Sequence, residues 1–265
     1  MVHTYVHTYT ANNNMIGPLP HEILALTSLV RLNLFNNEFQ GTVPTLNIER
    51  LTALKELDFS KNKLVGTVPS SVSSLTSLEI LRMESNKLRG TLPQSLSTLT
   101  NLTKIGFATN QLTGTIPFGF YFLTKLLDLS VGSNKLTGSI PTEVGQLSLL
   151  TNLSILGNRI TGTIPTEIGA LTDVINFQFA DIAITGTIPT EMGYLTAVSK
   201  LSLSYNPITG TVPDVFLNFQ NLKKLYLQNT KLVGNVTFLC SGLGPLDPFR
   251  VDLEEVDCEC CTCCA

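Results

Sequence analysis

The chain has 265 residues, with 17 basic and 20 acidic side chains and a net charge of −3. Such a balance lacks the strong positive charge of nucleic-acid-binding proteins, so we expect no nucleic-acid partner. No apolar run approaches the ~20 residues needed to cross a bilayer, and we expect no transmembrane segment in this chain. Residues 1–9 do not join a basic segment to an apolar one, so they do not form a secretory signal.

One sequence pattern, L-x-x-L-x-L-x-x-N-x-L-x-G-x-[IV]-P, returns through almost the whole chain. Successive glycines of this pattern lie 24 residues apart, apart from one step of 25 between Gly41 and Gly66. The pattern glycines are Gly17, Gly41, Gly66, Gly90, Gly114, Gly138, Gly162, Gly186, Gly210 and Gly234. A period of this length predicts a repeat solenoid of the α/β class, in which each unit packs on its neighbours.

A single repeat predicts one turn of a coil. Leu150, Leu153 and Ile155 have the spacing of a short strand with its anchors facing inward. Asn158 follows at the inward turn, where an amide side chain can pair buried backbone groups. Residues 161–165 predict a second, outer strand that ends at its proline, and residues 166–171 predict a 3₁₀ or short helical turn. Equivalent segments predict nine parallel inner strands.

The repeat resembles the plant-type leucine-rich repeat of receptor-like kinase ectodomains and polygalacturonase-inhibiting proteins, and similar arrays occur in algae. The likeness covers roughly residues 5–239. It implies a right-handed superhelix with a parallel concave sheet and a second, outer sheet. It also implies recognition of a protein, peptide or glycan. For the array itself we expect no cofactor and no metal site.

The chain departs from this family at its start. The family begins with a cysteine-paired cap that contains tryptophan, whereas this chain has no tryptophan and no cysteine before Cys240. Tyr5, Thr8 and Thr10 stand where leucines belong. We therefore expect residues 1–16 to be a truncated first repeat, 17–239 the repeat array, and 240–265 an acidic, cysteine-rich tail. We also expect the natural N-terminus, with a signal for secretion, to lie upstream.

The residues two, four and six positions before each asparagine are expected to face outward on the concave sheet. These positions vary between repeats while the leucine frame stays constant, which is typical of a binding surface but also of a merely solvated sheet. The candidate ligand-binding residues are Arg31, Asn33, Phe35, Glu56, Asp58, Arg82, Glu84, Lys104, Asp128, Lys200, Lys224 and Tyr226. We expect one mixed patch near Phe35 and another near Tyr226.

The outer strands offer an alternative surface. Five successive repeats carry Thr-Gly-Thr or Thr-Gly-Ser, from Thr113 to Thr211, which predicts two regular columns of hydroxyl groups. Such columns resemble those of ice-binding solenoids, so binding to ice or a mineral surface is the alternative function. The preference of threonine for exposed strands explains the same pattern without any function.

The tail carries all the cysteines of the chain. These are Cys240, Cys258, Cys260, Cys261, Cys263 and Cys264. Six cysteines can close three disulfides in 15 ways, which would seal the end of the array. Thiolate metal binding and lipidation remain alternatives, although the spacing is not that of an ordinary zinc site. Disulfides would require an oxidising compartment, and we expect a secreted or cell-surface protein.

Two further sets of residues bear on function. Sequons for N-glycosylation begin at Asn101, Asn152 and Asn235. The sequence contains no Ser-His-acid set and no phosphate loop, and within the array His21 is the one histidine. Acid-base chemistry therefore has few groups to use, and we expect a recognition protein that is not an enzyme.

Overall fold

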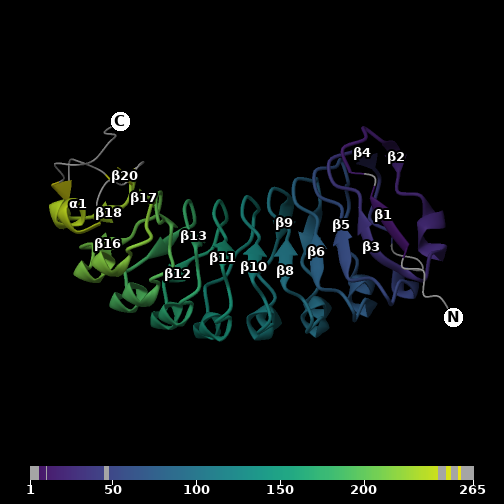
Figure 1. Ribbon diagram of the computed structural model, residues 1–265. Helices are drawn as coiled ribbons and strands as arrows, with labels where there is room; N and C mark the ends of the chain where they lie inside the picture. The colour runs from purple at the N-terminus through teal and green to yellow at the C-terminus, as the bar shows by residue number, and fades with distance from the viewer. Residues whose placement is uncertain (1–5, 10, 45–47, 244–248, 252–255, 258–265) are drawn as a thin grey trace. The chain divides into compact units, whose positions relative to one another are not determined.

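The computed structural model describes residues 6–9, 11–44, 48–243, 249–251 and 256–257. The chain divides into two compact units, Met1–Leu136 and Thr137–Ala265. Each unit is a stack of coils, and each coil contributes a short strand to a parallel sheet (Figure 1).

Unit 1 contains six strands of this inner sheet. They pair in parallel in the order of the chain: β1 (Val6–Tyr9), β3 (Leu29–Asn33), β5 (Glu56–Asp58), β6 (Ile80–Arg82), β8 (Lys104–Gly106) and β10 (Asp128–Ser130). The register advances by one repeat between neighbours, so that Asp58 lies beside Arg82 and Arg82 beside Gly106. Equivalent positions of successive repeats therefore form columns across the sheet.

Unit 2 repeats this arrangement with five inner strands. They are β11 (Asn152–Ser154), β13 (Asn176–Gln178), β15 (Lys200–Ser202), β17 (Lys224–Tyr226) and β20 (Phe249–Arg250). The last strand follows a single α-helix, α1 (Thr237–Leu243), which packs against the 3₁₀ turn of the preceding coil. Cys240 lies in α1, but its side chain and the other five tail cysteines are outside the described residues, so their pairing stays a prediction.

Outer strands and 3₁₀ turns complete the coils. The outer strands pair two by two: β2 (Ile16–Pro18) with β4 (Glu38–Gln40), β7 (Arg89–Thr91) with β9 (Gln111–Thr113), β12 (Gly162–Thr163) with β14 (Ile184–Thr185), β16 (Thr209–Gly210) with β18 (Lys231–Leu232), and β19 (Gly234–Asn235) with β21 (Val256–Asp257). The 3₁₀ turns are η1 (His21–Ala25), η2 (Ile48–Arg50), η3 (Ser70–Ser74), η4 (Gln94–Thr98), η5 (Phe118–Phe122), η6 (Thr142–Gln146), η7 (Thr166–Ala170), η8 (Thr190–Tyr194) and η9 (Asp214–Asn218).

The predicted architecture is confirmed. All nine expected inner strands are present, and each is followed by the expected turn. In the repeat around Asn158, Ile164 is buried, and Pro165 stands immediately before the 3₁₀ turn η7. The atypical first segment also contributes a strand, β1, which pairs with β3. Within the described part of the chain, no helix is both long enough and apolar enough to span a membrane.

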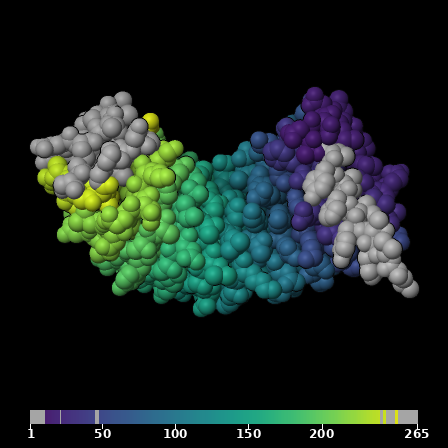
Figure 2. Space-filling view, in the orientation of Figure 1, coloured from purple at the N-terminus to yellow at the C-terminus, as the bar shows by residue number. Residues whose placement is uncertain are grey.

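The core is a continuous column of apolar side chains, mostly leucine with some phenylalanine, in each unit. Leu54, Leu57, Leu78 and Leu81 are fully buried, because each coil covers the leucines of the coil before it. The space-filling view shows the coils of unit 1 as adjoining bands from purple to blue (Figure 2). Burial of this kind contributes about 25 cal/mol per Å² of apolar surface and is the main stabilising term.

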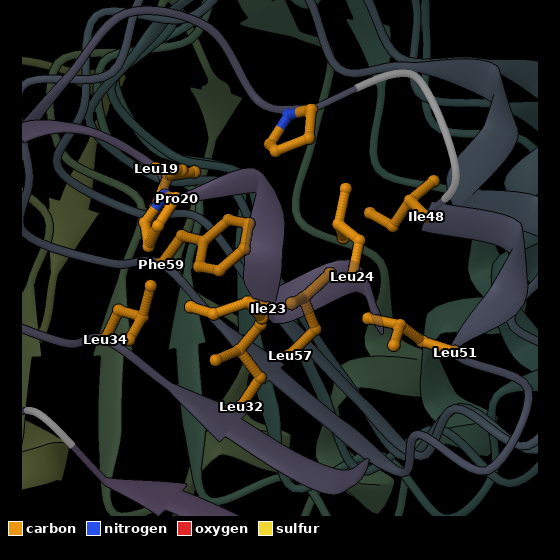
Figure 3. Close-up of a pocket in the computed structure, with 11 residues that line it drawn as sticks. Leu19, Pro20, Ile23, Leu24, Leu32, Leu34, Ile48, Leu51, Leu57 and Phe59 are labelled. Atoms are coloured by element: carbon orange, nitrogen blue, oxygen red, sulfur yellow. The ribbon is translucent and has the colours of Figure 1, made fainter. Parts of the chain in front are cut away.

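The first coils of unit 1 show how tightly this core closes. Eleven apolar side chains, including Leu24, Leu32 and Phe59, converge on one gap between the coils (Figure 3). The gap measures about 10 Å³, which is no more than a single water molecule requires. This part of the core therefore has no room for a ligand.

The asparagine column pairs the backbone at the inward turn, as predicted. In the coil of Asn86, the amide nitrogen donates to the carbonyls of Met83 in its own coil and Phe59 in the preceding coil, at 3.2 and 3.0 Å. The amide oxygen accepts the N–H of Leu64 at 3.0 Å. One side chain thus connects two coils and satisfies buried groups that have no access to water.

Two repeats have no asparagine in this column, and their hydrogen bonds show what the amide supplies in the others. At Thr230 the hydroxyl donates to Leu227 and accepts from the N–H of Leu232, so it reproduces part of the amide's role. At Ile182 no amide is present, and the N–H of Ile184 donates both to the carbonyl of Ile182, at 2.7 Å, and to the amide oxygen of Asn206 in the following coil, at 3.4 Å. The following Asn206 accepts the N–H of Ile182 at 3.2 Å.

We predict that Asn86→Ala lowers the free energy of unfolding by about 2–4 kcal/mol, because it leaves several buried backbone groups without partners. Urea denaturation followed by circular dichroism measures the loss. The matched control is Asn101→Ala, whose amide makes two exposed bonds, to the carbonyl of Thr76 and from the amine of Lys125, and should cost under about 1 kcal/mol because water can replace both. Equal effects of the two substitutions would contradict the role assigned to the column.

Candidate functional site

The outward columns of unit 1 gather polar side chains on the strand face of β3, β5 and β6. Four of the predicted binding residues, Phe35, Asp58, Arg82 and Glu84, line one open depression of about 230 Å³. Ser60, Lys61 and Ser85 complete its lining. This depression coincides with the mixed patch that the sequence predicts near Phe35.

The floor of the depression contains two carboxyl groups joined through one serine. Asp58 is 5% exposed and accepts the backbone N–H of Ser60 at 2.8 Å. The hydroxyl of Ser60, itself 4% exposed, donates to the Glu84 carboxylate in the next coil. Burial raises the pKa of the Glu84 carboxyl above its usual value of 4.5, and the nearby Asp58 charge raises it further. The bond from Ser60 and the charge of Arg82 act in the opposite direction.

A glycine sets the position of Glu84 and gives room to Arg82. Gly106 lies beside Arg82 in the sheet, and a methyl group added to it would collide with the Glu84 carboxylate. In the absence of a side chain there, Arg82 reaches Asp128, two coils away, with 3.8 Å between Nη2 and Oδ2. Arg82 is therefore directed away from Asp58, its neighbour on the other side.

An aromatic ring and an amine form one wall of the depression. The Lys61 Nζ lies 5.0 Å from the centre of the Phe35 ring, within the range of a cation–π contact. Lys61 is in the left-handed conformation, with φ of 53°, immediately before the asparagine of its coil. Every described coil from Asn36 to Asn229 has such a residue at this position.

The other predicted residues of unit 1 lie near this depression without lining it. The Nε of Arg31 lies 3.8 Å from Oε2 of Glu56, and the amide nitrogen of Asn33 donates to Oε1 of Glu56 at 3.2 Å. Lys104 and Asp128 are half-buried on β8 and β10. Arg31, Asn33 and Glu56 are thus engaged with one another, whereas Asp128 holds Arg82.

Unit 2 contains a smaller cluster on its own strand face. The Lys200 Nζ lies 5.9 Å from the centre of the Tyr226 ring and 3.4 Å from the amide oxygen of Gln178. Lys224 is exposed on the same strand as Tyr226. The structure therefore brings together Lys200 and Tyr226, as the sequence predicts for the second patch.

Three lining residues of the depression are absent from the predicted set. Ser60 occupies an outward column, but a serine carries no distinctive signal beside charged neighbours. Lys61 and Ser85 belong to the turn after the strand, and their left-handed backbone directs them to the depression. A sequence argument based on strand alternation gives no side-chain direction for such turn residues.

Sequence comparison relates parts of this chain to known proteins. The family model described as Leucine Rich Repeat matches residues 53–75, 77–99 and 197–219. These three segments are leucine-rich repeats. Receptor-like protein 36 of Arabidopsis thaliana is 38% identical over 64 residues, which are 24% of this chain and 9% of that relative. This chain therefore spans a small part of the curated relative it matches.

Solved leucine-rich repeat structures match over nearly the whole chain. A TDR receptor aligns with a TM-score of 0.87 and 30% identity, covering 93% of this chain and 43% of that one. The Arabidopsis receptor kinase HAESA, in complex with the peptide hormone IDA and the co-receptor SERK1, aligns with a TM-score of 0.78 and 28% identity, covering 93% and 46%. A plant ice-binding protein shares the fold, with a TM-score of 0.71 and 24% identity, covering 96% and 82%.

The hydroxyl columns of the leucine-rich repeats lie on the outer strands, as expected from the sequence. Thr161 and Thr185 donate their hydroxyls to the glycine carbonyl of the preceding coil, each at 3.2 Å. On the other side of each glycine, Thr163 places its methyl group against Gly186 of the next coil. Both threonine columns are exposed, and their side chains are held in a repeated orientation.

The three sequons differ in their surroundings. Asn235 is exposed but accepts hydrogen bonds from the N–H and hydroxyl of Thr237 in its own sequon. Asn101 is half-exposed and accepts a bond from Lys125 at 2.8 Å. Asn152 is half-buried on β11. Glycosylation at these positions stays a prediction.

Among the described residues, no three His, Cys, Asp or Glu side chains are grouped to hold a metal ion.

We predict that the Glu84 carboxyl titrates above 4.5 in a carbon-13 NMR titration of the side chain. Because its pKa is higher in the folded than in the unfolded chain, the folded state binds more protons between those two values. The stabilisation by this group is complete below the unfolded pKa, and the free energy of unfolding falls as pH rises through the folded pKa.

Two substitutions separate the causes of this shift. Asp58→Asn removes a neighbouring negative charge and should lower the Glu84 pKa, whereas Arg82→Gln removes a positive charge and should raise it. Shifts of the same sign in both variants, or a wild-type midpoint at or below 4.5, would contradict the electrostatic account.

Proposed function

We propose that this protein is a non-catalytic recognition module that binds a peptide or protein through the strand face of its leucine-rich repeats. The depression at Phe35, Asp58, Arg82 and Glu84 carries the proposal. It brings an aromatic ring, two acids and two bases together on the sheet. Such a mixed surface suits a polypeptide ligand better than a surface of one chemical kind would.

The chemistry of the remaining surface supports the same proposal. The leucine frame uses the inward side chains for packing, so the outward columns are free to vary between repeats. Tyrosine and arginine, which are enriched in binding hot spots, stand on this face at Tyr226 and Arg82. The similar receptor structure that holds a peptide hormone supports a peptide as the first class of ligand to test.

The proposed setting is the cell surface or the extracellular space, in signalling or defence. The resemblance to receptor ectodomains supports this setting, as do the sequons and the cysteine-rich tail. No structural observation bears on a glycan ligand, on the disulfides or on the oligomeric state. Binding of a glycan is a competing outcome of the experiment.

A random peptide library displayed on phage and selected against the purified chain tests the proposal. Peptides that survive selection should lose about tenfold in affinity, or about 1.4 kcal/mol, on Arg82→Ala or Tyr226→Ala, measured by isothermal titration calorimetry. The matched controls, Gln94→Ala and Gln146→Ala, remove exposed side chains from the 3₁₀ turns η4 and η6 and should leave affinity unchanged.

The same experiment has clear contrary outcomes. Peptides that respond to the η4 or η6 variants, and not to the strand-face variants, would place recognition elsewhere. A chain that selects no peptide but binds on a glycan array would replace the proposed ligand class with carbohydrate.

Adsorption to ice or a mineral surface is the second candidate, and the ordered hydroxyl columns favour it. The hydroxyls of Thr161, Thr185 and Thr209 are each fixed by a carbonyl of the preceding coil, at 3.2–3.3 Å. Side chains held in one repeated orientation lose little conformational entropy on meeting a regular solid.

If this second candidate holds, the protein shows thermal hysteresis, and Thr163→Lys or Thr187→Lys abolishes it by placing a long charged side chain in the column. Thr196→Lys, at an exposed position after η8, is the matched control and should retain the activity. Nanolitre osmometry measures the effect. An absence of hysteresis in the wild-type protein would eliminate the ice-binding candidate.

A further inference from the structure

Asp58 is a buried carboxylate with only part of its bonding capacity used. The side chain is 5% exposed and lines the depression, and one of its oxygens accepts the N–H of Ser60. Within the described part of the chain, its second oxygen has no hydrogen-bond donor and no cation within 4.0 Å. This oxygen is not among the fully enclosed, unpartnered side-chain atoms of the described residues, so it keeps a small accessible surface in the depression. It can therefore accept a bond from a ligand while most of the carboxylate is already removed from water.

The neighbouring cations do not neutralise Asp58. Arg82 is adjacent in the sheet but extends over Gly106 to Asp128, at 3.8 Å. Lys61 lies over the Phe35 ring, at 5.0 Å. Both cations therefore have a partner of their own, whereas the hydrogen bond to Asp58 comes from the Ser60 N–H and the Glu84 carboxylate accepts the Ser60 hydroxyl.

The depression is consequently suited to a positive group rather than to an anion. An anion near the floor would face the charge of Asp58 and the Glu84 carboxyl directly. A cation would gain two acceptors below it and, beside it, the face of an aromatic ring, to which cations are attracted. The volume of about 230 Å³ is far above the ~10–15 Å³ that a single water molecule requires, so the depression has room for the end of a cationic side chain.

We propose that this depression is a subsite for a cationic group of the ligand, an ammonium or a guanidinium, which binds Asp58 and Glu84 and replaces Lys61 over Phe35. This inference rests on the proposed function and names the chemistry that one part of the ligand must carry. Lys61 is exposed and unpaired with any acid among the described residues, so it can move into solvent when the ligand's cation arrives.

Capped tripeptides of known composition test the subsite on the full chain. Acetyl-Gly-Lys-Gly-amide and acetyl-Gly-Arg-Gly-amide are titrated into nitrogen-15-labelled protein, and the Ser60 amide reports directly because it bonds to Asp58. Both should give saturable shifts of this signal. Acetyl-Gly-norleucine-Gly-amide has a chain of similar length without the charge and should give none.

A further peptide identifies the source of the cation. Gly-norleucine-Gly-amide without the acetyl group offers only an α-ammonium. Saturable shifts from this peptide would also support the subsite and would extend its ligands to a chain terminus. Equal shifts from the capped norleucine peptide would overturn the inference, because binding would then not depend on charge.

Three variants give effects of different sign. Asp58→Asn should weaken binding of the lysine peptide about tenfold. Lys61→Met should strengthen it about threefold or more, because the competing cation is gone. Glu79→Gln, which removes an acid paired with Lys55 outside the depression, should leave it unchanged. Weaker binding by Lys61→Met, or unchanged binding by Asp58→Asn, would overturn the inference.

Failure of the subsite and failure of the proposed function are distinguishable. A library-selected peptide that responds to Tyr226→Ala but not to Asp58→Asn or Lys61→Met would keep recognition on the strand face and remove the cation subsite. A chain that binds the lysine tripeptide at Asp58 but selects no peptide would keep the subsite and remove the proposed function. Amide spectra of each variant confirm its fold before the titration.

Discussion

The structure depends on how each coil pairs its backbone where the chain turns inward. At that point the leucines exclude water, and the N–H and carbonyl groups must find protein partners. The asparagine amide supplies both a donor and an acceptor, and Asn62 uses them on its own coil and on the one before. Because the same residue pairs the same backbone groups in most repeats, the period of the sequence becomes the period of the structure.

This constraint separates the residues that hold the fold from those that are free to act. Inward positions are fully buried, so Leu57 or Leu81 cannot change without loss of packing. Outward positions carry no such demand. Gly106 shows the consequence: its missing side chain gives space to Glu84 and a path for Arg82 to Asp128. A recognition site arises here from variation at positions the frame does not need.

The period and strand alternation were sufficient to predict the fold and the strand-face columns. Asp58 and Arg82 could be placed side by side because the register advances by one repeat per strand. The depression itself could not be predicted, since it depends on where long side chains extend. No pattern shows that Arg82 reaches over Gly106, or that Lys61, in a left-handed turn, lies over Phe35. These contacts belong to three-dimensional neighbours with no fixed spacing in the sequence.

The charged side chains of unit 1 differ in how much binding energy they could gain from a ligand. Lys55 with Glu79 and Lys63 with Glu38 are ion pairs at 2.7 and 2.8 Å between exposed side chains, where water already screens both partners. A ligand that formed an ion pair with one of these exposed side chains would therefore gain little binding energy. Asp58 is 5% exposed and lies among neighbours that are bonded elsewhere, so a new partner meets a group that has already lost most of its contact with water in folding. Burial without full pairing, and not charge density, therefore marks the position on this surface where a ligand gains most.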